Sequence, residues 1–139
     1  MMVLVDTPVW SLALRRRPSA QLSAPEQRLA RTLAELIREG RVEILGPIRQ
    51  ELLSGIREEA QFRKLRDSLR AFPESPLQAE DYEEAARMSN QCRSRGIAGS
   101  AIDFLLCAAA CRRRWAIFTS DQDFQRYATV LPVQLYAIE

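Results

Sequence analysis

Four short runs with strand character, separated by stretches of helical periodicity, constrain the fold of this sequence more than any other feature. They lie at residues 2–5, 41–45, 115–119 and 133–138. Parallel strands need long crossover connections, which helices usually provide, so this order predicts strands that run parallel. The expected fold is α/β with three layers: a central parallel sheet of four to five strands between helices, in a single domain over residues 1–139.

The stretches between the strands carry helix signals. Ser23, with Glu26 three positions on, has the pattern of a capping box that opens a helix. Apolar residues recur every three or four positions along 57–71, which predicts an amphipathic helix. The helix expected over 100–111 is apolar on almost every face and is therefore predicted to be buried. Residues 72–77 are interpreted as a proline-broken strand at the edge of the sheet.

The chain has no histidine, and this absence excludes several kinds of catalytic site. A Ser-His-Asp triad, a Cys-His pair and an HExxH zinc site all need an imidazole. Lysine-dependent chemistry would rest on Lys64 alone, which lies in a charged stretch without glycine. Any catalysis is therefore expected to depend on carboxylates.

Neither end-of-chain signals nor cysteines indicate secretion. The first residues have no basic n-region and carry Asp6 inside an apolar run, so they are not expected to form a signal peptide. Cys92, Cys107 and Cys111 are odd in number and lack CxxC spacing, and we interpret them as small buried hydrophobic residues. We expect a cytoplasmic location, without a disulfide framework or membrane association.

Acidic residues follow the ends of several predicted strands. Asp6 comes directly after the first strand, Glu51 lies in the helix after the second, and Asp121 and Asp123 follow the strand at 115–119. Asp103 lies in the first turn of the helix that leads into that strand, so antiparallel packing would bring it to the same edge. Ligands of parallel sheets collect beyond the carboxyl ends of the strands. The acids are therefore expected to converge at one edge of the sheet.

Helix capping is the alternative explanation for each of these acids. Asp6 would cap the helix that follows it, and Ser100 with Asp103 and Ser120 with Asp123 fit capping boxes. Glu51 would then simply face water. Capping does not, however, require the acids to meet at one edge, nor does it require an aspartate to begin an otherwise apolar helix.

A divalent cation would explain such convergence. Two carboxylates about 4 Å apart repel by roughly 4 kcal/mol at an effective dielectric near 20, and crowded carboxylates raise one another's pKa unless a positive charge lies between them. Ligands that are all carboxylate oxygen favour Mg²⁺ or Mn²⁺ over zinc or copper. Ions held in this way activate water and stabilise the leaving oxygen of a phosphodiester, which is nuclease chemistry without an imidazole.

Four stretches in order carry a resemblance to a known family. They are "VLVDTPVWSLAL", "RQELLSG", "GIAGSAIDFLLCAAA" and "AIFTSDQDF". Together they resemble the PIN-domain ribonucleases and, more narrowly, the VapC-type toxins of VapBC toxin–antitoxin operons, which the chain matches in length and motif order. The resemblance implies a PIN-like fold, a Mg²⁺ or Mn²⁺ site, endoribonuclease cleavage of structured RNA, and homodimers held inactive by a cognate antitoxin.

The resemblance also assigns individual positions. The family's acidic quartet, which would be both catalytic and metal-binding, corresponds to Asp6, Glu51, Asp103 and Asp121. Asp123 matches a less uniform fifth acid, and Thr119 matches a threonine that would orient an acid through its hydroxyl. Pro8 is a departure, because relatives commonly carry serine there. Proline suits a first helical turn, so the fold should tolerate it although one polar contact is lost.

The charge balance is compatible with a polyanionic substrate. The formal net charge is +2, but with the four quartet acids neutralised by metal the remaining 20 basic and 14 acidic residues give +6. Arg15, Arg16 and Arg17 would bind phosphates or an acidic antitoxin, or would form a solvated loop. Trp10, with Leu14, belongs either to the core or to an apolar groove for a partner helix. The basic residues at 112–114 are interpreted as complementing a helix dipole.

Two other functions remain open from the sequence. An aspartyl-nucleophile phosphatase or phosphotransferase is suggested by "DQD" after a strand, although such enzymes carry this motif at the beginning of the chain. A catalytically inactive PIN fold would only bind RNA or a protein partner, but all four acids of the quartet are present.

Overall fold

The computed structural model describes residues 1–14 and 21–138. Its strands are β1 (Val3–Val5), β2 (Val42–Glu43), β3 (Ala116–Phe118) and β4 (Gln134–Leu135). Its helices are α1 (Thr7–Leu14), α2 (Ala24–Arg38), α3 (Gly46–Leu53), α4 (Glu59–Leu69), α5 (Ala79–Ser94), α6 (Ala101–Arg113) and α7 (Asp123–Ala128).

The strands form one parallel sheet in the order β2-β1-β3-β4. Leu4 pairs with Glu43 on one side and with Ile117 on the other, and β3 pairs in parallel with β4. Four strands confirm the predicted parallel sheet. The expected edge strand at 72–77 is reduced to a single parallel bridge between Ile44 and Glu74, because prolines at positions 73 and 76 have no N–H for a ladder.

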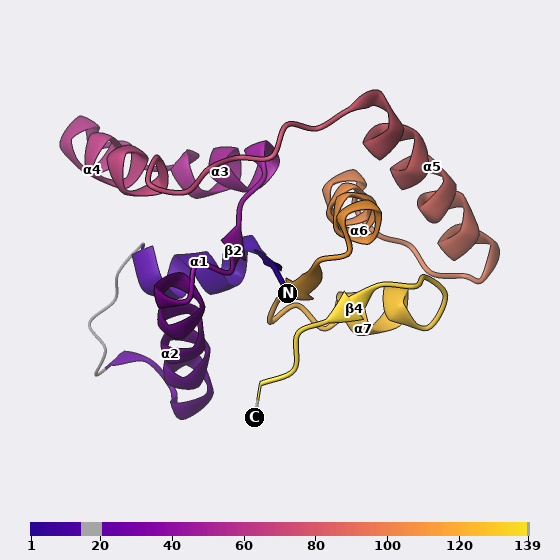
Figure 1. The fold of residues 1–139 in the computed structure, drawn as a ribbon, viewed down its shortest axis with the longest axis horizontal. Coiled ribbons are helices and arrows are strands. Elements are labelled where there is room, and N and C mark those ends of the chain that lie inside the picture. The colour runs from indigo at the N-terminus through magenta and orange to yellow at the C-terminus, as the bar shows by residue number, and fades with distance from the viewer. Residues whose placement is uncertain (15–20, 139) are drawn as a thin grey trace.

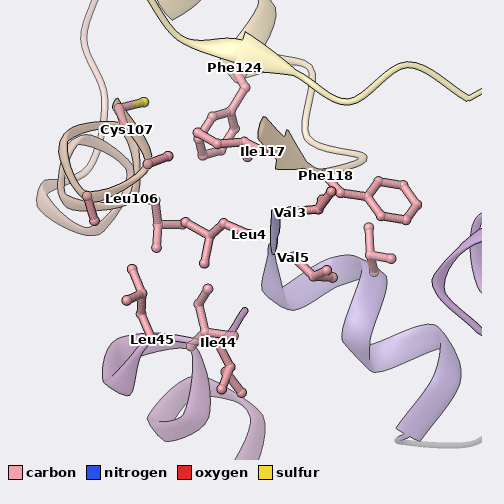
Figure 2. Close-up of a cluster of buried hydrophobic side chains, with 14 of the residues drawn as sticks. Val3, Leu4, Val5, Ile44, Leu45, Leu106, Cys107, Ile117, Phe118 and Phe124 are labelled. Carbon is pink, nitrogen blue, oxygen red and sulfur yellow. The ribbon is translucent and has the colours of Figure 1, made fainter. Parts of the chain in front are cut away.

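Helices cover both faces of the sheet, as predicted. In Figure 1, α5 and α6 lie on one side of the strands and α1 and α2 on the other. Successive strand residues point to opposite faces, and Figure 2 shows Leu4 and Ile117 extending toward α6 while Phe118 extends to the other side. All three side chains are fully buried. The sheet therefore contributes apolar side chains to two core layers, one on each face.

The helix ends follow the sequence signals closely. Ser23 Oγ accepts a hydrogen bond from the Glu26 amide at 3.2 Å, and the Ser23 amide donates to Glu26 Oε1 at 2.9 Å, so the predicted capping box is confirmed. Helix α1 begins at Thr7 with Pro8 in its first turn, and the fold tolerates this proline as expected. Phe104 to Ala110 of α6 are all buried, which confirms the prediction of a buried helix.

A buried ion-pair cluster joins α5 to the end of α6. Asp81 is completely buried, and Arg112 and Arg113 approach its carboxylate at 2.6 and 2.7 Å. The two arginines do lie in the last turn of α6 as expected, but they also provide the counter-charge for Asp81, which the sequence analysis did not identify.

Two of the three cysteines are buried in the core. Cys92 and Cys107 are buried as predicted, whereas Cys111 is only partly buried and its thiol lies 3.6 Å from the Pro132 carbonyl oxygen.

In the part of the chain that the structure describes, no helix is both long enough and apolar enough to span a membrane.

Candidate metal centre

The site is built first by two neighbouring strands. Asp6 follows β1 and Thr119 follows β3, and the Asp6 amide continues the ladder by donating to the Phe118 carbonyl at 2.9 Å. The Asp6 side chain is nearly buried, with 7% exposed. Its Oδ2 accepts from the Thr119 hydroxyl and its Oδ1 from the Thr7 amide, both at 2.8 Å. The parallel pairing of β1 and β3 thus fixes Oδ2 of Asp6, and the start of α1 fixes Oδ1.

The pKa of Asp6 reflects this environment. Burial raises the pKa from 3.8 to about 6, against the opposing effect of the hydrogen bonds from Thr119 and Thr7. The negative charges of Asp103 and Glu51 raise it further. Asp6 therefore lies in the electrostatic range of two other predicted site residues, and a cation there would stabilise its ionised form.

Three more aspartates converge beside Asp6. One carboxylate oxygen from each of Asp103, Asp121 and Asp123 lies within 4.8 Å of the others. Asp103 is in the first turn of α6, Asp121 lies in the loop between β3 and α7, and Asp123 is the first residue of α7. The structure thus groups three of the five acids that were predicted to converge, and these three come from two segments distant in sequence.

Backbone-to-side-chain hydrogen bonds order the loop that carries Asp121. The Asp121 amide donates to Thr119 Oγ1 at 3.0 Å, and the Asp123 amide donates to Asp121 Oδ1 at 2.9 Å. Asp123 is exposed and pairs with Arg126 at 3.6 Å. Thr119 thus connects Asp6 to the Asp121 loop, and Asp123 is the outermost of the clustered acids.

The capping alternatives are met only in part. Ser100 Oγ accepts from the Asp103 amide at 3.0 Å, but among the described residues the reciprocal bond from the Ser100 amide to the Asp103 carboxylate is absent, so only half of the predicted capping box forms. The box of Ser120 with Asp123 does not form, because the Asp123 amide donates to Asp121 instead. Asp6 does receive amides at the start of α1, through its side chain and its carbonyl oxygen. Capping and convergence therefore coexist at this edge of the sheet.

Glu51 lies at the periphery of the site. It is an exposed residue of α3 and lines an open cavity of about 250 Å³ that it shares with Ile102, the residue before Asp103. Its charge contributes to the raised pKa of Asp6. The structure therefore places Glu51 beside the start of α6, outside the group that the three clustered aspartates form.

Tyr127 contacts the site, although the sequence analysis did not single it out. Its hydroxyl donates to Asp103 Oδ2 at 2.6 Å, and the residue is fully buried. Burial, followed by the hydrogen bond to Asp103, raises the pKa of Tyr127, so the phenol remains a donor. A tyrosine on the apolar side of a helix, with a polar hydroxyl that needs a partner, was the available signal.

The predicted RNA- or partner-binding residues divide into two groups. Arg15, Arg16 and Arg17 lie outside the described residues. Trp10 is fully buried and packs edge-on against Phe72, with ring centroids 5.0 Å apart, so it belongs to the core and not to a surface groove. Leu14 is partly buried and lines an open groove of about 620 Å³ between the end of α1 and α4.

The donor chemistry of the cluster fits Mg²⁺ or Mn²⁺. Every candidate ligand atom is a carboxylate oxygen: three clustered aspartates lie within 4.8 Å of one another, and Asp6 is near enough to Asp103 for that charge to raise its pKa. Crowded carboxylates repel one another unless a cation offsets their charge. Hard oxygen ligands of this kind select magnesium or manganese.

Comparisons with known proteins agree with this fold. A family model described as "PIN domain" matches residues 3–130. No curated protein matches the chain. Among solved structures, FitAcB from Neisseria gonorrhoeae has a TM-score of 0.76 at 21% identity, and the alignment covers 98% of this chain and 97% of that chain.

Two further solved structures share the fold. VapBC2 from Rickettsia felis, bound to a DNA fragment from its promoter, has a TM-score of 0.76 at 14% identity and covers 98% of both chains. A toxin–antitoxin complex from Klebsiella pneumoniae has a TM-score of 0.66 at 17% identity, with 88% of this chain and 89% of that chain covered. At such low identities the likeness shows a shared fold alone.

Proposed function

The chain belongs to the PIN domain family, and on this premise we propose that it is a Mg²⁺- or Mn²⁺-dependent endoribonuclease and the VapC-type toxin of a toxin–antitoxin pair. Nuclease activity is general among PIN-domain toxins. The observation that carries the proposal is the convergence of Asp103, Asp121 and Asp123 within 4.8 Å, beside the nearly buried Asp6. The single domain over residues 1–139 is part of the same proposal.

Each acid has a distinct part in the proposed site. Asp6, Asp103 and Asp121 would hold the metal, with Glu51 reaching the site from α3 and Asp123 as the outer, accessory acid. Thr119 keeps Asp6 oriented through its 2.8 Å hydrogen bond. When bound, the metal would supply an activated water and stabilise the leaving oxygen of the phosphodiester. The buried position of Asp6 makes that carboxylate poorly hydrated and thus receptive to a cation.

RNA is the proposed substrate because of the charge balance and the family. The chain offers carboxylates and no imidazole for general base chemistry. With the four quartet acids neutralised by metal, the remaining 20 basic and 14 acidic residues give the chain a net positive charge, which favours binding of a polyanion such as RNA.

An antitoxin is the proposed protein partner, and a homodimer the proposed assembly. One structural neighbour is described as a toxin–antitoxin complex, which supports such a partner here. The groove of about 620 Å³ is lined by the apolar residues Leu14, Ile56 and Leu65, and its charged residues are two basic ones, Arg57 and Lys64, and one acidic one, Glu58. A segment with apolar and acidic side chains would complement that lining.

RNA cleavage by the purified protein tests the proposal. We expect cleavage that needs Mg²⁺ or Mn²⁺, stops with EDTA, and is lost in Asp103→Asn. Asp67→Asn is the matched control, because Asp67 is an exposed aspartate of α4 outside the cluster. Cleavage that persists in Asp103→Asn would assign the activity to another centre. Metal binding without any cleavage would favour the inactive, binding-only alternative, and a phosphoaspartate trapped at Asp121 would favour the phosphatase.

A further inference from the structure

We propose that Tyr127 is a positioning residue of the metal centre, which sets how Asp103 presents its carboxylate and how far Asp103 lies from Asp121 and Asp123. The inference deepens the proposed function and rests on it. It starts from the 2.6 Å hydrogen bond that the Tyr127 hydroxyl donates to Asp103 Oδ2.

The ring of Tyr127 is held firmly in one place. Tyr127 is fully buried, and its ring centroid lies 5.1 Å from that of Phe104 and 5.2 Å from that of Phe124. Phe104 follows Asp103 on α6, and Phe124 follows Asp123 on α7. The aromatic contacts thus aim the hydroxyl at Asp103 from a ring that has little freedom to rotate.

Gly99 leaves the space that this hydroxyl occupies. A Cβ at position 99 would lie 2.5 Å from the Tyr127 hydroxyl oxygen and 2.8 Å from two of its ring carbons. Gly99 is not among the glycines with positive φ, so its backbone conformation does not require glycine. The absence of a side chain here is therefore explained by the close approach of Tyr127.

The hydrogen bond also gives the two carboxylate oxygens of Asp103 different roles. Oδ2 accepts from the phenol, which leaves Oδ1 free to face a cation. Tyr127 belongs to α7, which begins at Asp123 and follows the loop that carries Asp121, so the same bond ties α6 to the segment that holds the other two acids. Partners that hydrogen-bond to metal-ligating side chains orient them, and their loss typically weakens metal affinity about 10- to 100-fold.

A purely structural tyrosine would behave differently from a positioning one. Phenylalanine at 127 keeps the ring contacts, so Tyr127→Phe removes the hydrogen bond to Asp103 while the packing stays. If Asp103 served only as the hydrogen-bond partner that a buried hydroxyl needs, Tyr127→Phe would change the stability of the metal-free protein but not its metal affinity.

Mn²⁺ titration by calorimetry separates these possibilities. We expect Tyr127→Phe to bind Mn²⁺ about 10-fold more weakly than the wild type, or weaker still. Tyr82→Phe is the matched control, because Tyr82 is an exposed tyrosine on α5 and the loss of its hydroxyl should leave the affinity unchanged. Gly99→Ala places a Cβ against the Tyr127 hydroxyl and should displace it from Asp103, so this variant should also bind Mn²⁺ more weakly than the wild type. It replaces Tyr127→Phe in the test if that variant does not fold.

Two further readouts complete the test. RNA cleavage by Tyr127→Phe should be lost at low Mn²⁺ and recover as Mn²⁺ is raised, while far-ultraviolet circular dichroism shows the variant to be folded without metal, so that the recovery reports metal affinity and not refolding. Adding Mn²⁺ should produce a near-ultraviolet tyrosine difference signal in the wild type and in Tyr82→Phe that is absent from Tyr127→Phe. Equal Mn²⁺ affinity in the wild type and Tyr127→Phe would overturn this inference alone. A wild type that binds no divalent cation would overturn the proposed metal site together with it.

Discussion

The hydroxyl of Thr119 lies 2.8 Å from Oδ2 of Asp6, although 113 positions separate the two residues in the sequence. The same hydroxyl oxygen accepts the Asp121 amide at 3.0 Å. One short side chain therefore links the acid after β1 to the loop after β3. Because both strands end at the same edge of a parallel sheet, the backbone alone brings these groups into hydrogen-bonding distance.

Thr119→Val should destabilise the protein by about 1–3 kcal/mol, because it removes a hydrogen bond to a nearly buried carboxylate while keeping the shape of the side chain. Urea unfolding in metal-free buffer at neutral pH would measure the loss. Thr129→Val is the control, since Thr129 is exposed and its hydroxyl only reaches the Arg126 carbonyl oxygen. Equal losses in the two variants would show that the bond to Asp6 contributes nothing particular.

The ionisation of Asp6 should make the metal-free protein less stable as the pH rises. Burial raises the pKa of Asp6 from 3.8 to about 6, so the folded state binds its proton more tightly than the unfolded state. The stabilisation is fully present below pH 3.8 and is lost as the pH rises through about 6. The difference amounts to about 3 kcal/mol, on the order of 1.4 kcal/mol per unit of pKa.

Asp6→Asn isolates this effect, because asparagine does not titrate. With EDTA present, the wild type should lose about 3 kcal/mol of unfolding free energy between pH 4 and pH 8 through the ionisation of Asp6, and Asp6→Asn should not. The stability of Asp6→Asn relative to the wild type should therefore increase over this pH range. Parallel pH profiles for the two proteins would mean that Asp6 titrates normally in the folded chain.

Much of the sheet and of its acidic edge follows from sequence pattern alone. Asp6 and Thr119 could be placed together because strands that run parallel end at one edge, and the direction of a strand follows from the helix that connects it to the next. Ser23 could be recognised as a cap because capping depends on residues three positions apart. Such features need only local sequence and the direction of the chain.

Contacts between side chains of different helices could not be found in this way. Tyr127 looks like any large residue on the inner side of a helix, and its hydrogen bond to Asp103 depends on how α7 packs against α6. Asp81 looks like a first-turn acid, and only the packing of α5 on α6 brings Arg113 to it. The prolines at 73 and 76 did suggest a weak edge strand, but only the fold shows that a single bridge remains.

Mg²⁺ should raise the melting temperature of the wild-type protein, because the folded state gathers carboxylates that the unfolded chain keeps apart. The rise should be absent in Asp6→Asn and retained in Asp67→Asn, whose aspartate lies outside the cluster. Differential scanning calorimetry over a series of Mg²⁺ concentrations would measure it. A full rise in Asp6→Asn would remove Asp6 from the metal site and leave the three clustered aspartates as its ligands.

Arg113→Ala should cost about 3 kcal/mol of unfolding free energy, because it leaves the completely buried Asp81 without its two-bond partner. Arg112, whose guanidinium lies 2.6 Å from the Asp81 carboxylate, offsets part of this loss.

The stabilisation by Arg113 should depend on pH. The guanidinium of Arg113 holds the pKa of Asp81 well below its usual range, so the pair stabilises the fold above pH 3.8 and less as the pH falls below it. The gap between wild type and variant, measured by urea unfolding, should therefore narrow toward pH 3. Arg87→Ala, which breaks an exposed pair with Glu84, should change the stability by less than about 0.5 kcal/mol at any of these pH values. A gap that stays constant with pH would mean that Arg113 stabilises α5 and α6 by packing and by its bonds to backbone carbonyl oxygens, and not by its charge.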